Sequence, residues 1–288
     1  MNSKELTEKV MTALINVAKD NAVKSDEDYI EDGLKFCGKC RSPKECKISF
    51  LGSEAIVPCL CECGLREREE EKVKFERSQI QIEKDRKRAE CFDNKTLWGY
   101  TFDACEIKDT QMYKTAEKYA ENFEVMKEDA QGLLFFGNVG YGKTYIAASI
   151  ANALIDKGYS CYMGTMANIA SIMSSGRDEV KREFYKSIKE YDLFIIDDLG
   201  AERDTSYMDE MVYTVIDRRY HSHLPTIITT NMDLDELKKP QTAARKRILS
   251  RLYEMCIFVE VKGKDRRRVE NMERYNKYKD LLGLPGKE

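Results

Sequence analysis

The chain has 288 residues and a formal net charge of −3, with 34% charged and 42% hydrophobic residues. This length suffices for one substantial domain and a small module, while the near-neutral charge restricts nucleic-acid binding to local patches. No run approaches the roughly 18 apolar residues of a membrane helix, and the N-terminus lacks the apolar core of a signal peptide, so a cytoplasmic protein without a membrane partner is expected.

Residues 1–66 are predicted to form a small N-terminal module. Its first turns have the apolar spacing of an amphipathic helix, at Leu6, Val10, Leu14 and Val17. Six of the ten cysteines then fall between Cys37 and Cys63. In a reducing compartment such clustering indicates a metal site rather than a disulfide framework.

The spacing of these cysteines is typical of a structural zinc site. Cys37 and Cys40 form one pair, and the second pair comes from the run Cys59-Leu60-Cys61-Glu62-Cys63, about twenty residues later. Four thiolates around Zn²⁺ leave no open position, so the metal is expected to stabilise a segment too small for a core of its own.

Residues 67–95 are expected to form a charged linker helix. This stretch is dominated by Glu, Lys and Arg and contains neither Gly nor Pro. Helix propensity and Glu/Lys pairs one turn apart favour a long solvated helix. A specific coiled coil is disfavoured, because apolar a and d positions are not sustained.

Residues 96–288 alternate strand-like apolar runs with helical patterns. Strands are expected at 132–136, 160–164, 192–197, 225–230 and 256–261, and helices at 143–157, 166–191 with a break near Gly176, 205–222 and 243–254. Alternation of this kind predicts an α/β domain with a five-stranded parallel sheet flanked by helices on both faces.

A glycine-rich loop between the first predicted strand and helix is the candidate nucleotide site. Glycines in such a loop let the backbone wrap closely around phosphates, with the positive end of the next helix behind them. A lysine then reaches the β- and γ-phosphates, and a hydroxyl binds Mg²⁺. The residues expected to contact ATP and Mg²⁺ are Gly137, Asn138, Val139, Gly140, Tyr141, Gly142, Lys143, Thr144 and Tyr145.

Two acids follow the apolar run of the third predicted strand. Ligands of open α/β sheets lie at the carboxyl ends of the strands, where Asp197 and Asp198 stand. Asp197 is the candidate for the Mg²⁺ shell, with Thr144, and Asp198 for orienting or deprotonating the attacking water. Glu202 is a spare carboxylate that could share the second task.

The fourth predicted strand ends in Thr229-Thr230-Asn231. If this strand lies between the other two, the amide of Asn231 is positioned to hydrogen-bond the attacking water or the γ-phosphate. Asn231 is therefore a third candidate catalytic residue.

In this order the motifs resemble those of AAA+ ATPases. Within that class the run Ile195-Ile196-Asp197-Asp198-Leu199-Gly200-Ala201-Glu202 is similar to that of the DnaC/DnaI-type replicative helicase loaders of bacteria and phages, which are related to IstB-type transposition ATPases. Three further motifs fit this family: Thr101-Phe102, Arg247-Ile248-Leu249-Ser250-Arg251-Leu252, and Val261-Lys262-Gly263-Lys264-Asp265-Arg266-Arg267. The resemblance covers residues 101 to about 270.

The resemblance implies an AAA+ sheet of the ASCE type and roles for two arginines. Arg251 matches the finger that reaches the nucleotide of a neighbouring subunit, with Arg247 as the alternate. Arg267 matches the second sensor, with Arg266 a close rival. The chain departs from many AAA+ proteins in having Asp198 instead of Glu, which implies slow or conditional hydrolysis. Only about 27 residues follow the last predicted strand, so a full C-terminal lid is not expected.

The resemblance also selects a zinc quartet. The Cys-x-Cys after Val57-Pro58 is similar to that of the loader family, which favours Cys37, Cys40, Cys59 and Cys61. Cys63 could replace either of the later two, and Cys46 could also serve.

The family implies ATP-dependent loading of a hexameric replicative helicase onto single-stranded DNA. In that hypothesis the zinc module and linker helix hold the helicase, and the ATPase domains self-associate. The zinc module favours it over a transposition ATPase that coats duplex DNA. A third hypothesis is an ATP-binding switch scaffold that scarcely hydrolyses its nucleotide, which Asp198 keeps open.

Overall fold

The computed structural model describes residues 27–50, 53–106, 108–174, 178–201, 205–238, 242–263 and 265–285. The predicted N-terminal helix, Glu202 and Lys264 lie outside these ranges. The chain divides into two compact units, Met1–Ile82 and Glu83–Glu288, and the division falls within one helix. Among the described helices, none is both long and apolar enough to cross a membrane.

In its described residues the first unit contains two β-hairpins, β1 (Tyr29–Glu31) with β2 (Leu34–Phe36) and β3 (Glu45–Phe50) with β4 (Ser53–Pro58). Asp32 and Gly33 turn the first hairpin with φ of 50° and 76°. An Asp-Gly pair with positive φ at both positions is the two-residue turn that matches strand twist. Strands this short bury little apolar surface, so another interaction must hold the unit together.

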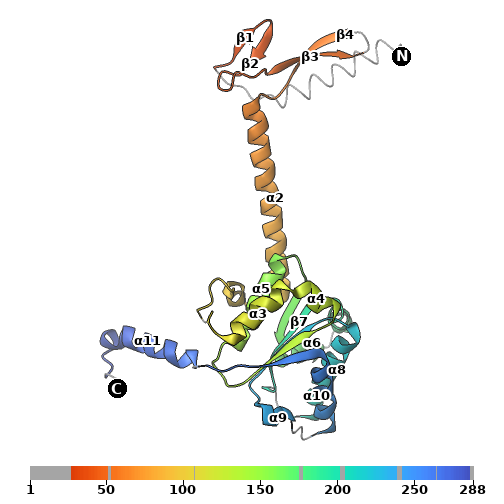
Figure 1. Cartoon of the computed structure of the whole chain (residues 1–288), viewed down its shortest axis with the longest axis vertical. Helices are drawn as coiled ribbons and strands as arrows, with labels where there is room; N and C mark the ends of the chain where they lie inside the picture. The colour runs from red at the N-terminus through yellow and green to blue at the C-terminus, as the bar shows by residue number, and fades with distance from the viewer. Residues whose placement is uncertain are drawn as a thin grey trace. The chain divides into compact units, whose positions relative to one another are not determined.

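The helix α2 (Glu62–Cys91) covers most of the predicted linker segment (Figure 1). Ion pairs one turn apart stabilise it, as in the contacts of Arg86 with Glu83 and Glu90. Its last turns belong to the second unit. There Arg88 donates to Asn152 Oδ1 at 3.1 Å and to Asp156 Oδ1 at 2.8 Å, which ties the end of α2 to α5 (Lys143–Asp156).

The second unit is built on a parallel five-stranded sheet of order β6-β7-β8-β5-β9. All five strands lie where the sequence predicted them: β5 (Gly132–Phe136), β6 (Cys161–Thr165), β7 (Leu193–Leu199), β8 (Thr226–Thr230) and β9 (Cys256–Glu260). The order places β8 between β5 and β7, so the candidate residues at their carboxyl ends share one edge of the sheet.

The helices that follow α2 are η1 (Lys95–Gly99), α3 (Gln111–Glu121), α4 (Phe123–Glu128), α5 (Lys143–Asp156), α6 (Met166–Ser174), α7 (Asp178–Ser187), α8 (Ser206–Ser222), α9 (Leu234–Lys238), α10 (Ala243–Met255) and α11 (Arg266–Leu282). Of these, α3 and α5 pack on one face of the sheet, and α6, α8 and α10 pack on the other. In the described part after β9, α11 is the one helix.

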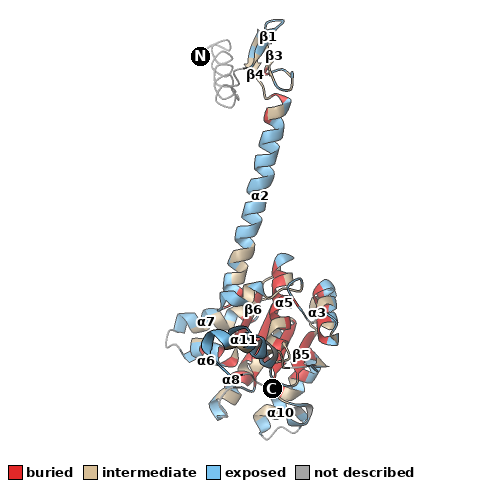
Figure 2. Ribbon diagram, turned by 90° about the vertical axis from the view of Figure 1, so that its left-hand side faces the viewer, coloured by how far each residue is buried: buried red, intermediate tan, exposed pale blue. Residues whose placement is uncertain are grey.

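Alternation along the strands divides the core in two. Leu133 and Phe135 of β5 face a cluster formed with α3 and α5, whereas Leu134 and Phe136 face one formed with α6, α8 and α10. Because successive strand residues point to opposite faces, the strands of a doubly covered sheet read as continuous apolar runs. Figure 2 shows this buried layer in red between partly exposed helices.

Arg219 of α8 is a fully buried cation in the second cluster (0% exposed). Its guanidinium donates to four oxygens at the amino-terminal end of the sheet: Ile188 O, Tyr191 O, Pro225 O and Thr226 Oγ1, at 2.6–3.1 Å. Burial lowers the pKa of Arg219, and these acceptors replace the water that it loses. The residue thereby joins α8 to the segments before β7 and β8.

The Arg219→Met substitution is therefore expected to lower the free energy of unfolding by about 3–5 kcal/mol, because it leaves buried oxygens without donors. Arg218→Met is the matched control on the same helix. Arg218 stacks over the Tyr185 ring at 4.0 Å, a contact worth about 1 kcal/mol. Urea unfolding followed by the fluorescence of Trp98, the single tryptophan, measures both. Equal losses in the two variants would contradict this role of Arg219.

Candidate functional site

The glycine-rich loop leads from β5 into α5. Gly137, Gly140 and Gly142 have φ of 129°, 85° and 88°, a region that disfavours any side chain. A Cβ on Gly137 would lie 2.6 Å from Val261 O, and one on Gly140 would lie 2.1 Å from Asp265 Oδ1. Gly142 caps α5 without a side chain, so the first amides of that helix are open to an anion.

Lys143 lies at the start of α5 and is buried (5% exposed). Its ammonium donates to Gly137 O, Asn138 O and Asn231 Oδ1 at 2.7–2.8 Å. Burial lowers the pKa of Lys143, although the charges of Asp198 and Asp197 oppose that shift. A positive charge held over the loop by weak neutral acceptors suits phosphate oxygens, which are stronger acceptors.

A β-bulge brings both acids of β7 to the same site. Ile196 pairs with Ile228 and Leu199 pairs with Thr230. Two residues of β7 thus lie between these pairs where β8 has one, so β7 contains one extra residue. Asp198 sits in this bulge with φ of 57°. Neighbours on a regular strand point to opposite faces, and the extra residue removes that alternation.

Asp197 faces the start of α5. Its two carboxylate oxygens each lie 3.1 Å from Thr144 Oγ1, and Oδ1 accepts a hydrogen bond from Thr229 Oγ1 at 2.6 Å. Burial raises the pKa of Asp197, and hydrogen bonds from Thr229 and Thr144 oppose that shift. A hydroxyl and a buried carboxylate in contact are hard oxygen donors of the kind that Mg²⁺ prefers, so the residues present fit this ion.

Asn231 joins the loop to the second acid. Its amide Oδ1 accepts from Lys143 Nζ, and its Nδ2 donates to Asp198 Oδ1, both at 2.8 Å. The structure therefore brings together Lys143, Thr144, Asp197, Asp198 and Asn231. They meet because β8 lies between β5 and β7, the condition that was set for Asn231 from the sequence.

The segment before α11 packs against the glycine loop. Arg266 N donates to Gly140 O at 3.1 Å, and the side chain of Asp265 caps the helix through Arg267 N. The Arg266 side chain pairs with Glu106, whereas the charge of Arg267 acts on Lys143 and lowers its pKa further. The charge of Arg266 also acts on Tyr145, so both rivals stand near the nucleotide loop and the choice of Arg267 stays a prediction.

Tyr145 connects the site to the segment that opens the domain. Its hydroxyl donates to Thr101 O at 3.1 Å, and its ring stacks on Tyr100 at 4.5 Å. Phe102 in turn packs edge-on against Tyr113 at 5.5 Å. The Thr-Phe motif therefore lies beside the first turn of α5.

The two candidate finger arginines differ in their surroundings. Arg251 forms an ion pair with Asp217 of α8 and packs over the rings of Tyr213 and Tyr220, with 19% of its side chain exposed. Arg247, one turn earlier on α10, is exposed. Arg251 is held within its own chain, and the alternate Arg247 faces solvent.

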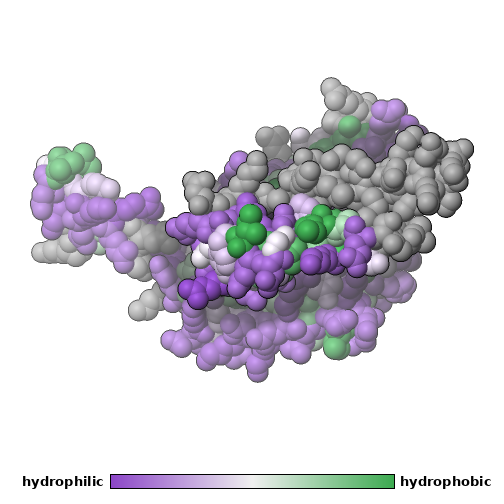
Figure 3. All heavy atoms as spheres, turned by 90° about the horizontal axis from the view of Figure 1, so that it is seen from above, coloured by the Kyte–Doolittle hydropathy of each residue, from purple (hydrophilic) through white to green (hydrophobic). Residues whose placement is uncertain are grey.

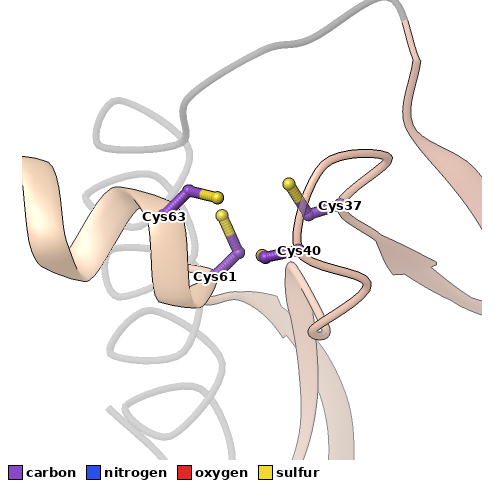
Figure 4. A group of neighbouring side chains, drawn as sticks. All are labelled: Cys37, Cys40, Cys61 and Cys63. Carbon is purple, nitrogen blue, oxygen red and sulfur yellow. The ribbon is translucent and has the colours of Figure 1, made fainter.

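Four cysteines of the first unit meet in one cluster (Figure 4). The sulfurs of Cys37, Cys40, Cys61 and Cys63 all lie within 4.8 Å of one another. A tetrahedral zinc with bonds of about 2.3 Å needs sulfurs about 3.8 Å apart, so the cluster fits Zn²⁺ after a small contraction. Cys61 and Cys63 flank the first residue of α2, whose positive end favours thiolates.

The predicted quartet was wrong at one position, where the structure places Cys63 instead of Cys59. Cys59 forms a disulfide with Cys46, and the Cα atoms of the two are 6.1 Å apart. Cys59 extends β4 beside the start of β3, whereas Cys61 and Cys63 lie past the point where the chain turns into α2. The turn separates Cys59 from the other sulfurs.

The thiols in the cluster influence one another. Hydrogen bonds from Ser42 lower the pKa of Cys40 to about 5, and the hydrogen bond with Cys40 raises the pKa of Cys63 to about 11. Burial also raises the pKa of Cys61. Sulfurs this close repel one another when ionised, so the four thiols cannot all lose their protons without a nearby cation. A divalent metal supplies that positive charge.

Sequence reasoning missed two residues of the nucleotide site. Thr229 holds Asp197 through its hydroxyl, and the same oxygen accepts the backbone N–H of Asp198 at 2.9 Å. Asp265 caps α11 and contacts Gly140. Both belong to motifs noted in the sequence, but only the fold reveals their partners.

Comparisons with known proteins agree with this geometry. Residues 67–274 match the family described as IstB-like ATP binding protein. The chain is 28% identical over 184 residues to a protein named replicative helicase loader DnaI from Bacillus subtilis (strain 168), covering 59% of each. It is 31% identical over 129 residues to replicative helicase loader DnaC from Escherichia coli (strain K12), covering 43% of this chain and 51% of that one. The chain thus spans little more than half the length of these curated relatives.

Solved structures give the same fold. The crystal structure of the DnaC helicase loader superposes with a TM-score of 0.50 at 26% identity, covering 59% of this chain and all of that one. The crystal structure of DnaI superposes with a TM-score of 0.51 at 24% identity over 62% of this chain, which supports the fold alone. Because the family model spans more than half of the sequence, the chain belongs to the IstB-like ATP-binding protein family, and its glycine loop, paired acids and sheet order make it a P-loop ATPase of the AAA+ type.

Proposed function

We propose that this protein loads a replicative DNA helicase in a reaction controlled by ATP. The observation that carries the proposal is the presence, in one chain, of a nucleotide site and a separate four-cysteine module joined by α2. An ATPase that acts on a partner needs a surface distinct from its catalytic site. The relatives named replicative helicase loader direct the choice of partner.

The chain's residues divide the nucleotide chemistry among them. The loop amides and Lys143 would hold the phosphates, and Thr144 and Asp197 would hold Mg²⁺, which supplies charge neutralisation when bound. Asp198 would accept a proton from the attacking water or orient it. Asn231, already bonded to Asp198, would fix the direction of that carboxylate. The short side chain of Asp198 makes slow or partner-dependent hydrolysis the expected behaviour.

The four-cysteine cluster would hold a structural zinc ion. Four thiolates complete the coordination shell, so this metal would fix the hairpins to the start of α2 and would take no part in hydrolysis. The hairpins expose apolar side chains, with Ile30 78% and Ile56 46% exposed. Figure 3 shows apolar groups among polar ones on this face. Exposed apolar residues on a rigid module are suited to contact with the helicase.

Contact with single-stranded DNA would come from the basic side chains of α7 and not from its aromatic rings. On α7 the rings of Phe184 and Tyr185 pack towards the second core cluster, and Phe184 meets Tyr162 edge-on at 5.5 Å. They are therefore not free to stack on bases. Arg182 and Lys186 remain exposed and could contact phosphates.

Hydrolysis is expected to need an arginine from a neighbouring copy. Exposed Arg247 is favoured over Arg251, whose ion pair with Asp217 makes it a structural contact between α8 and α10. Arg247→Ala should keep ATP binding and lose hydrolysis by about 10³-fold or more. Arg251→Ala should instead lower the melting temperature. Steady-state phosphate release and thermal denaturation of both variants measure these effects, and full hydrolysis by Arg247→Ala would exclude it as the finger.

The loader proposal is tested by capture of the cognate replicative helicase on the full chain. The wild type and Cys59→Ser are expected to carry one zinc per chain and to capture the helicase, whereas Cys63→Ser should lose both. With ATP, the captured helicase should pass to a single-stranded oligonucleotide. If the wild type fails to capture the helicase, it is not a loader. If Cys59→Ser loses zinc and Cys63→Ser keeps it, the zinc quartet is misassigned.

A further inference from the structure

One buried hydroxyl of β8 lies opposite the two acids of the nucleotide site. In the bulge, Asp197 and Asp198 of β7 face the single residue Thr229 of β8, which is 0% exposed. Thr229 Oγ1 lies 2.6 Å from Asp197 Oδ1 and 2.9 Å from the backbone N of Asp198. The N–H can only donate, so the hydroxyl accepts from Asp198 and gives its own proton to the Asp197 carboxylate.

The bond to Asp197 fixes the plane of that carboxylate. The last torsion of an aspartate side chain has a broad energy minimum, so an unbound carboxylate turns easily. With Oδ1 held by Thr229, both carboxylate oxygens lie 3.1 Å from Thr144 Oγ1 at the start of α5. Asp197 is 8% exposed, so little water is available to replace this bond. Thr229 thereby presents the carboxylate to the position assigned to Mg²⁺.

The bond from Asp198 holds the backbone that carries the second acid. Asp198 has φ of 57°, and a bulge interrupts the regular ladder of hydrogen bonds at the extra residue. An amide left without a partner in this place would be unfavourable. Thr229 accepts that N–H, so one hydroxyl supports the positions of both acids.

We propose that Thr229 is a positioning residue of the ATPase site, which sets both the Mg²⁺ affinity of Asp197 and the direction of Asp198. Partners that orient a metal ligand from outside the coordination shell change metal affinity or activity by about 10–100-fold when they are removed. Thr229 acts through the two aspartates and not by contact with the nucleotide. The inference rests on the proposed assignment of Mg²⁺ to Thr144 and Asp197 and is independent of the helicase.

Thr230, the next residue along β8, supplies a matched control. It is also 0% exposed. Its Oγ1 donates to Leu199 O at 2.7 Å and accepts from Met232 N at 3.1 Å, and both of these bonds are to backbone groups. Valine at either position keeps the branched shape and removes a buried hydroxyl with two partners. The two variants should therefore lose similar stability and differ at the metal.

The test uses the full chain and a fluorescent, non-hydrolysable ATP analogue, whose affinity is measured in EDTA and again in excess Mg²⁺. By linkage, the ratio of the two affinities scales with the Mg²⁺ affinity of the protein–nucleotide complex. Thr229→Val should keep the affinity in EDTA within about threefold of the wild type and lower the ratio by about 10-fold or more. Thr230→Val should leave both values within about threefold.

Single-turnover hydrolysis of ATP reports on the second acid. In Thr229→Val at saturating Mg²⁺ and ATP, where metal affinity no longer limits the rate, hydrolysis should still fall by about 10-fold because Asp198 has lost its backbone support. Unchanged hydrolysis under these conditions would remove Asp198 from the role of Thr229.

Serine and alanine at the same position separate the hydroxyl from the packing. Thr229→Ser should retain the wild-type ratio, whereas Thr229→Ala should lower it as Thr229→Val does. These two variants differ by the hydroxyl alone, so they decide the question if the valine variant does not fold.

A wild-type ratio in Thr229→Val, equal ratios in the serine and alanine variants, or an equal loss in Thr230→Val would overturn the role of Thr229. If Mg²⁺ does not change the affinity of the wild type, the metal assignment of Asp197 fails and the inference fails with it. None of these measurements involves the helicase, so the loader proposal stands or falls separately on capture.

Discussion

The nucleotide site depends on one irregularity in the sheet, the bulge of β7 at Asp197 and Asp198. Without it the two carboxylates would point to opposite faces, and one would enter the core beneath the helices. Thr229 of the neighbouring strand stabilises the bulge by donating to Asp197 and accepting from the backbone of Asp198. A left-handed residue other than glycine is costly, of order 1–3 kcal/mol, and such strain is typical of functional sites.

From this bulge a chain of hydrogen bonds runs along the edge of the sheet and connects the other residues of the site. Asp198 holds Asn231, Asn231 holds Lys143, and Lys143 closes the glycine loop. The loop in turn packs against the segment that begins α11. Phosphate bound in the loop would therefore act on both acids and on the start of α11. In the first unit the cysteine cluster supplies a comparable organising centre where little apolar core exists.

Much of this was predictable because the signals are local. Five apolar runs with helices between them specify a doubly covered parallel sheet, and a glycine loop between strand and helix specifies a phosphate site. Asp197 and Asn231 could be assigned because strand ends meet at one edge. The bulge could not be predicted, since Leu193–Leu199 reads as a regular strand and its partner lies some thirty residues away in sequence.

The difference at the zinc quartet has the same cause. Spacing alone allows Cys59, Cys61 and Cys63 equally, and only the turn from β4 into α2 separates Cys59 from the cluster. The partner of Arg251 is Asp217, on a different helix, so this ion pair could not be read from the finger motif, and the finger itself stays a prediction. Contacts distant in sequence determined each outcome.

The most direct test compares two substitutions in the hydrogen-bonded chain that runs from the bulge to the loop. Equilibrium binding of a fluorescent ATP analogue and single-turnover hydrolysis are measured for Lys143→Ala and Asn231→Ala. The account predicts that Lys143→Ala loses binding, whereas Asn231→Ala keeps binding within about threefold and loses hydrolysis by about 10²-fold or more. Unchanged hydrolysis by Asn231→Ala would contradict the claim that the strand ends act as one site.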